Sequence, residues 1–301
     1  MHDLPYEENP NWKEILDRLS GIRDSGDYSH ENVELIRQEL QSFDERIRGG
    51  ATLAAEGCLF EPYILDQVIS IAEYDDTPAI RKAAIRSLSI VIHEGVMEGM
   101  EDEAGADTQL DEAEEWEEFQ TGGLRDDYQR VKNLLFNFLE YEDDVEIQEL
   151  ALSALADLGF RVEIRDKISE FLASERQSAK QIALNAMGKY PRYWEEELCA
   201  LIKLDTPEEL LKEAISASYA SESAALAKAI TGILEHKNPE TLRFAILALA
   251  NINKTENLPD ILQQFGLHPD SQVREAARDA IETFTQKNFK QYMREDLGLE
   301  D

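Results

Sequence analysis

Residues 145–155 of the chain read VEIQELALSAL. Aligned counterparts follow at 177–187 (QSAKQIALNAM), 208–218 (EELLKEAISAS), 239–249 (PETLRFAILAL) and 271–281 (SQVREAARDAI). Alanine stands at the same place in all five, as Ala151, Ala183, Ala214, Ala245 and Ala277, at spacings of 32, 31, 31 and 32 residues. A fixed period of this length predicts a protein built of stacked repeats.

The spacing inside each copy is helical. A second alanine follows three residues after the first, and a larger residue, usually apolar, comes next, as in Ala154 and Leu155. Residues three and four apart share one face of an α-helix. Two alanines one turn apart allow a neighbouring helix to approach closely, and the flanking Leu, Ile and Met side chains fill the remaining space.

A sixth copy lies upstream at residues 78–88 (PAIRKAAIRSL), with Ser87 in place of the second alanine. Its first alanine, Ala84, precedes Ala151 by 67 residues, which is two periods and a few residues more. The sequence therefore predicts that one repeat is missing between these copies or is replaced by an insertion.

A helix-start signal and a second helical run precede the copies. Thr77-Pro78, Thr206-Pro207 and Asn238-Pro239 place a capping residue before a first-turn proline. Upstream amphipathic runs cover 62–74, 124–141, 162–173, 193–204, 224–236 and 258–267. Two helices in each period of about 31 residues predict a helical hairpin repeat.

We call the aligned 11-residue pattern of these copies the alanine frame. It resembles the second helix of a HEAT repeat, in the short bacterial form related to phycobilin-lyase HEAT-like repeats. Ile80-Arg81 and Val273-Arg274 match the apolar-Arg pair of that family, and Ala179-Lys180 nearly does. Three pairs depart from it, namely Ile147-Gln148, Leu210-Leu211 and Thr241-Leu242. The resemblance implies an all-α, right-handed, armadillo-like α-solenoid of about seven antiparallel helical hairpins, and a scaffold or adaptor function.

The repeats suggest five segments. We expect capping helices or a degenerate repeat at 1–60, a HEAT-like repeat at 61–95, an acidic insertion at 96–123, five HEAT-like repeats at 124–285 and a C-terminal cap and tail at 286–301. Gly49-Gly50 is expected to separate a helix over 31–47 from the residues that follow.

We expect a soluble, cytoplasmic protein and favour a monomer. Hydrophobic residues make up 43% of the 301 residues, but no apolar run approaches the 18 residues of a membrane span. The first ten residues are polar and acidic, unlike a secretory signal. Cys58 and Cys199 are isolated and lie in apolar surroundings, which favours buried thiols in a reducing compartment.

The chain is strongly acidic, with 63 Asp and Glu residues, 30 Lys and Arg residues and a net charge of −33. Such a charge repels phosphate, so we expect no direct binding to nucleic acid. Three interpretations remain: a basic partner, mimicry of nucleic-acid charge, or a surface adapted to high salt.

The acidic residues concentrate where the repeat period is interrupted. Residues 87–124 contain no Lys or Arg, and twelve acidic residues lie between Glu94 and Glu118. Trp116 and Phe119 lie among carboxylates at the end of this run, and they are candidates for docking a basic partner. Alternatively, the segment is a solvated loop, which these aromatic side chains attach to the solenoid.

Two further sets of residues are candidates for partner binding. One is a row on the second helices, expected along the concave face of the solenoid as a groove for an acidic or polar peptide. It consists of Lys82, Arg86, Gln181, Asn185, Lys212 and Arg243. The other is the aromatic turn of Tyr190, Tyr193 and Trp194. In the alternative interpretations, the row forms salt bridges with acidic neighbours, and the aromatic side chains pack under the next repeat.

No familiar catalytic, phosphate-binding or metal-binding motif occurs. His30-Glu31 and His93-Glu94 resemble the iron-binding pairs of deoxyhypusine hydroxylase, a HEAT-repeat enzyme, but neither begins a second helix as in that family. We expect a non-catalytic scaffold that binds a protein or peptide, without cofactor or metal. The alternatives are an acidic mimic or chaperone for a basic nucleic-acid-binding protein, and a lyase-like or metal-dependent enzyme subunit.

Overall fold

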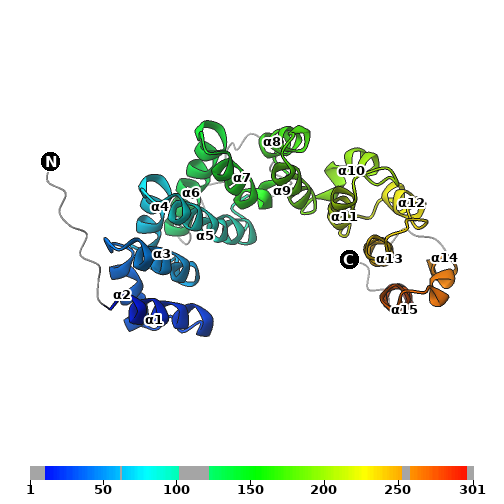
Figure 1. The fold of residues 1–301 in the computed structure, drawn as a ribbon, viewed down its shortest axis with the longest axis horizontal. Helices are drawn as coiled ribbons and strands as arrows, with labels where there is room; N and C mark the ends of the chain where they lie inside the picture. The colour runs from blue at the N-terminus through cyan, green and yellow to red at the C-terminus, as the bar shows by residue number, and fades with distance from the viewer. Residues whose placement is uncertain (1–10, 62, 102–121, 253–257, 297–301) are drawn as a thin grey trace. The chain divides into compact units, whose positions relative to one another are not determined.

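The computed structural model describes residues 11–61, 63–101, 122–252 and 258–296, without the side chains of 122–123 and 287–296 (Figure 1). Every regular element within these ranges is a helix. The chain divides into two compact units, residues 1–161 (unit 1) and 162–301 (unit 2). In the part of the chain that the structure describes, no helix is long and apolar enough to cross a membrane.

Unit 1 begins with α1 (Trp12–Ser25) and continues as three hairpins. These are α2 (His30–Glu39) with α3 (Glu45–Ala54), α4 (Ile64–Tyr74) with α5 (Pro78–Met97), and α6 (Gly122–Tyr141) with α7 (Val145–Ala154). The 3-10 helices η1 (Ala55–Cys58) and η2 (Ala156–Leu158) follow α3 and α7. The second helices stack in order, because α3 contacts α5 and α5 contacts α7.

The described residues of unit 2 form four hairpins, drawn from green to red in Figure 1. They pair α8 (Val162–Ala173) with α9 (Gln177–Met187), α10 (Glu195–Leu201) with α11 (Glu208–Ala217), α12 (Ala224–Gly232) with α13 (Pro239–Asn251), and α14 (Leu258–Gln263) with α15 (Ser271–Asp296). Two 3-10 helices, η3 (Pro191–Tyr193) and η4 (Gln264–Leu267), precede α10 and α15. Again the second helices contact one another in order, from α9 to α15. The predicted solenoid of helical hairpins is confirmed.

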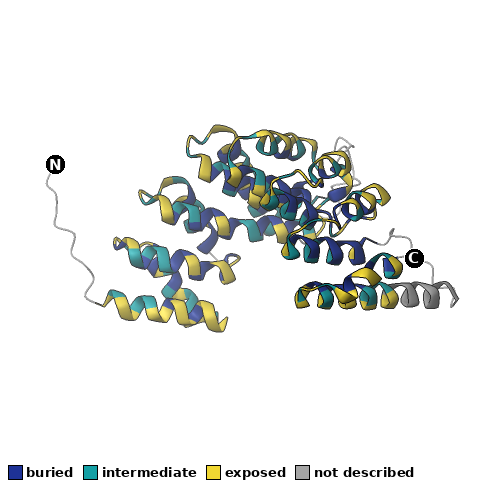
Figure 2. Cartoon of the chain, turned by 45° about the vertical axis from the view of Figure 1, so that its right-hand side comes forward, coloured by how far each residue is buried: buried dark blue, intermediate teal, exposed yellow. Residues whose placement is uncertain are grey.

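The alanine frame forms the core of each stack. Ala151, Ala183, Ala214 and Ala245 are 0% exposed and Ala277 is 2% exposed. The second alanines of the frame are at most 5% exposed. Buried residues, dark blue in Figure 2, accordingly lie between the stacked helices of each unit. The inference of close helix packing from paired alanines is confirmed.

A seventh copy of the frame was not recognised in the sequence. Residues 45–55 (ERIRGGATLAA) lie on α3 in the same register, and Ala51 precedes Ala84 by 33 residues. Ile47, Ala51 and Ala54 are at most 1% exposed. The expected helix break at Gly49-Gly50 is wrong, since α3 runs through both glycines. A Cβ on Gly50 would lie 2.5 Å from Leu16 Cδ2, so glycine here permits close packing of α1 on α3.

The interval between Ala84 and Ala151 contains no additional hairpin among the described residues. α5 contacts α7 directly, so their repeats are successive. The extra residues lie between α5, which extends to Met97, and α6, which begins at Gly122. This arrangement supports an insertion over a missing repeat. The five-segment division remains a prediction, although α15 continues without a break through its boundary at 285/286.

The predicted helix starts are correct for two of the three prolines. Pro78 and Pro239 occupy the first turns of α5 and α13, after the capping residues Thr77 and Asn238. Asn238 Oδ1 accepts a hydrogen bond from the Glu240 N–H at 2.8 Å. At α11 the prediction is wrong by one residue, because Pro207 itself occupies the capping position.

Candidate functional site

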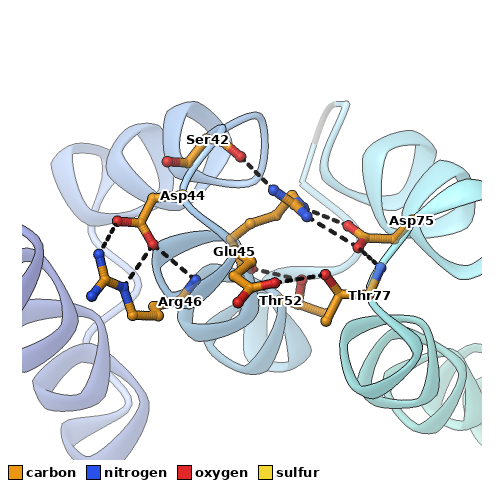
Figure 3. A network of polar contacts seen from close by, with 8 residues as sticks. Ser42, Asp44, Glu45, Arg46, Thr52, Asp75 and Thr77 are labelled. Atoms are coloured by element: carbon orange, nitrogen blue, oxygen red, sulfur yellow. Dashed lines mark hydrogen bonds and ion pairs between the residues drawn. The ribbon is translucent and has the colours of Figure 1, made fainter. Parts of the chain in front are cut away.

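A half-buried arginine, Arg48, joins the first two hairpins of unit 1 (Figure 3). Arg48 Nη2 donates to Asp75 Oδ1 at 3.1 Å, and Arg48 Nε donates to Asp75 Oδ2. Arg48 Nη1 also donates to the Ser42 carbonyl at 2.7 Å. Burial by itself would raise the pKa of Asp75, but Arg48 and the Thr77 N–H outweigh it and hold this pKa below its usual value. The guanidinium therefore fixes the turn of its own hairpin to the turn of the next.

The same connection is repeated one hairpin later. Arg81 Nη2 lies 2.7 Å from Glu142 Oε2, and Arg81 Nε donates to the Ala72 carbonyl at 3.1 Å. Asp75 and Glu142 each lie five residues before the first apolar residue of the frame, Ile80 and Ile147 respectively. The two rungs form an Arg-carboxylate ladder, which aligns three successive turns along one edge of unit 1.

The ladder stops after these two rungs. Gln148 replaces the next arginine and donates to the Glu142 carbonyl of its own turn at 2.7 Å. In unit 2 the carboxylate position is held by Ser174, His236 and His268 in three of the four hairpins. Each accepts a hydrogen bond from the backbone N–H two residues ahead, at 3.1–3.2 Å. Those turns are therefore closed locally, and their acceptors are not carboxylates.

The predicted row on the second helices is largely engaged within the chain. Lys82 Nζ lies 3.1 Å from Asp144 Oδ2 and 2.5 Å from Glu146 Oε2. Lys212 Nζ lies 2.9 Å from Glu209 and 3.0 Å from Glu240. These hydrogen bonds raise the pKa of both lysines. The arrangement agrees with the alternative in which the row forms salt bridges with acidic neighbours.

The other members of the row divide into two kinds. Gln181 Nε2 donates to Glu213 Oε1 at 2.8 Å, and Arg243 Nη1 donates to Gln272 Oε1 at 2.8 Å, so both bridge to the following repeat. Arg86 and Asn185 are exposed. The row therefore joins adjacent repeats at Lys82, Gln181, Lys212 and Arg243.

The aromatic candidates occupy different environments. Trp194 is only 3% exposed, and Tyr190 and Tyr193 are half-buried. The Arg165 guanidinium lies 4.4 Å from the centre of the Tyr193 ring, and Arg192 lies 5.3 Å from it. The burial of Trp194 agrees with the alternative in which the aromatic side chains pack within the solenoid. The ring of Tyr193 instead makes cation–π contacts with Arg165 and Arg192. Trp116 and Phe119 lie outside the described residues.

One carboxylate fixes the chain where the acidic segment begins. Glu101 Oε2 lies 2.7 Å from Arg161 Nη1, and Glu101 Oε1 contacts Lys132 Nζ. Burial favours the neutral acid, but Lys132 and Arg161 outweigh it and lower the pKa of Glu101. The position of Glu101 within a uniformly acidic run gave no sequence signal for this contact.

The negative charge is distributed unequally. Of the net charge of −33, residues 1–161 account for −26 and residues 162–301 for −7. Among the described residues, at least ten of the thirteen Lys and Arg residues of unit 1 lie in ion pairs with its own carboxylates. Few cations are therefore left to offset the remaining acidic side chains of this unit.

Two of the turns joined by the ladder share a triplet that sequence reasoning missed. They read Tyr74-Asp75-Asp76 and Tyr141-Glu142-Asp143, an aromatic residue followed by two acids in the same register before the second helix. The rings are 74% and 82% exposed. In each triplet the middle acid contacts an arginine of the preceding second helix, and the last acid is exposed. Phe43-Asp44-Glu45 has a similar composition but lies two residues later relative to α3, where Asp44 is the capping residue.

The His-Glu pairs do not come together. Glu31 lies 2.8 Å from Arg18, and His93 Nδ1 lies 3.0 Å from Asp157 Oδ2. Within the described ranges, no group of three or more His, Cys, Asp or Glu residues is placed to hold a metal ion.

Comparison with solved structures identifies the fold. Importin-beta crystallised in ammonium sulfate matches 94% of this chain with a TM-score of 0.55 and 14% identity. Yeast importin-beta matches 91% with a TM-score of 0.52 and 13% identity. A designed armadillo repeat protein matches 73% of this chain and 99% of its own, with a TM-score of 0.43 and 16% identity. The chain has a HEAT-like repeat fold and spans 40% and 38% of the two importin-beta chains.

No protein-family model matches the sequence, and no curated protein matches it either. The two importin-beta likenesses are at 14% and 13% identity, so they establish the fold alone, and a function has to be argued from the chemistry of the surface.

Proposed function

We propose that the chain is a non-catalytic repeat scaffold that binds another protein, and that the partner presents a basic segment to unit 1. The observation that supports this function is that the Lys and Arg side chains of unit 1 pair with carboxylates of the same unit. Most Lys and Arg side chains of unit 1 are paired within it, and the unit retains a charge of −26. An excess of exposed carboxylates attracts a cationic partner and repels phosphate.

The reducing environment of the cytoplasm suits such a protein. Burial, aided by the nearby Glu61 carboxylate, raises the pKa of Cys58 to about 11, and burial also raises the pKa of Cys199. Both thiols are thus held in the neutral form, which is the less reactive form.

The test is affinity capture from the source cell with the intact chain, at 150 mM and 500 mM salt, followed by direct binding measurements with the purified partner. We expect a basic partner whose affinity falls steeply between the two salt concentrations, because exposed charges are screened. A matched variant replaces residues 102–121, which include nine carboxylates, with a Gly-Ser linker. If the described repeats bind the partner, this variant retains it. An acidic partner, or affinity indifferent to salt, would contradict the proposal.

A second candidate function is an acidic mimic or chaperone for a basic nucleic-acid-binding protein. The concentration of charge in unit 1 favours it, since a mimic occupies the phosphate-binding surface of its partner. Competition separates the two functions. Duplex DNA or RNA displaces the chain from its partner if it is a mimic, and leaves the complex intact if it is a scaffold that binds elsewhere.

A further inference from the structure

Tyr74 and Tyr141 occupy equivalent places in successive hairpins. Each lies three residues before the capping residue of the second helix, which is Thr77 in α5 and Asp144 in α7. The Arg81–Glu142 rung and the direct contact of α5 with α7 place the two turns side by side. Rings that are 74% and 82% exposed contribute little to the stability of the fold, so their recurrence calls for another explanation.

Each ring lies two residues before a carboxylate that has no hydrogen-bond or ion-pair partner among the described residues. Asp76 and Asp143 are exposed, and neither makes a hydrogen bond or ion pair with any described residue. The carboxylate between ring and acid, Asp75 or Glu142, is neutralised by its arginine. Each turn thus offers a π-face and one unpaired negative charge. A cationic side chain satisfies both at once, through a cation–π contact and an ion pair.

The spacing of the turns indicates how far apart the cationic residues of a bound peptide would lie. Packed helices lie about 8–10 Å apart, and an extended peptide advances about 3.3 Å per residue. One turn therefore corresponds to about three peptide residues. The turn before α3 does not continue this pattern, because Glu45 accepts a hydrogen bond from Thr77 Oγ1 at 3.1 Å and Phe43 lies two residues out of register with Tyr74.

We propose that these two turns form one docking row, defined by Tyr74, Asp76, Tyr141 and Asp143, for an extended peptide that carries Arg or Lys at positions about three residues apart. This inference rests on the proposed function and specifies its site and the partner's pattern. In unit 2 the corresponding triplets read Ala173-Ser174-Glu175, Leu204-Asp205-Thr206, Glu235-His236-Lys237 and Leu267-His268-Pro269. They lack the combination of an aromatic ring with two acids, so the row belongs to unit 1.

The experiment measures binding of a labelled 13-residue peptide to the intact chain by fluorescence anisotropy at 150 mM salt. The peptide has arginine at every third position, with glycine and serine between. Two double variants remove the rings (Tyr74→Ala with Tyr141→Ala) or the charges (Asp76→Asn with Asp143→Asn). All four side chains are exposed, so circular dichroism is expected to show unchanged folding.

Matched controls alter exposed side chains that follow α3 and α5 in the chain. Phe60→Ala with Tyr63→Ala removes two exposed rings, and Glu56→Gln with Glu98→Gln removes two exposed charges. We expect about tenfold weaker binding for each variant of the docking row and less than twofold weakening for each control.

Two outcomes would overturn the inference. The first leaves the proposed function standing, and the second overturns it as well. If row variants and controls weaken binding equally, cations associate diffusely with unit 1, and the inference fails while the proposed function stands. If the wild-type chain does not bind the peptide at 150 mM salt, both fail.

Discussion

Replacing Arg48 with alanine is expected to lower the free energy of unfolding by about 3 kcal/mol at neutral pH. The Asp75 side chain is 4% exposed and the Arg48 side chain 17%. Removal of the guanidinium leaves a buried carboxylate without its cation, and it also leaves the Ser42 carbonyl without its donor. Urea denaturation followed by circular dichroism measures the loss.

The loss depends on pH in a defined direction. The native pKa of Asp75 lies below its ordinary value of 3.8, so the stability from this pair is fully present above that value and disappears as the pH falls through the native pKa. Wild type and Arg48→Ala should therefore begin to converge in stability as the pH falls below 3.8, and should become equal only below the native pKa of Asp75.

Arg130→Ala is the matched control for Arg48→Ala. Arg130 pairs with Asp66 at 2.7 Å, but the side chains are 51% and 57% exposed. An exposed pair of this kind contributes about 0–1 kcal/mol. Equal losses for the two variants would contradict a structural role for the ladder.

Ala84→Leu is expected to destabilise the chain by about 2–3 kcal/mol. Ala84 is 0% exposed on α5, which packs against α3 and α7. The three added carbon atoms have no space at native packing density unless the helices move apart. Thermal and urea denaturation measure the effect.

Ala79→Leu provides the control on the same helix. Ala79 is exposed near the start of α5, and its replacement is expected to change stability by less than about 0.5 kcal/mol. If Ala84→Leu were equally mild, alanine at this frame position would not be setting the distance between helices.

The alanine period made the architecture predictable because it reports a requirement of packing. Stacked second helices approach closely only where side chains are small, so the spacing of Ala151, Ala183 and Ala214 reflects the spacing of the hairpins. The copy on α3 was overlooked because Gly49-Gly50 suggested a break. Glycine there serves close packing against Leu16, which depends on a neighbouring helix.

The polar contacts were less predictable, because they join residues far apart in the sequence. The apolar-Arg pair identified Arg81, but its partner Glu142 lies 61 residues later, beyond the acidic segment. Lys82 and Lys212 stood out as cations on an acidic protein, yet each pairs with carboxylates of the following repeat. Sequence position alone does not distinguish such a lysine from one that is available to a ligand.

The central claim is that the exposed carboxylates of the docking row bind a cationic segment. Carboxyl footprinting of the intact chain, with carbodiimide labelling and mass spectrometry, tests it most directly. The account predicts that the 13-residue arginine peptide slows labelling of Asp76 and Asp143 at least fivefold and leaves the equally exposed Glu56 and Glu98 unchanged. Equal protection of all four carboxylates, or protection of none, would contradict it.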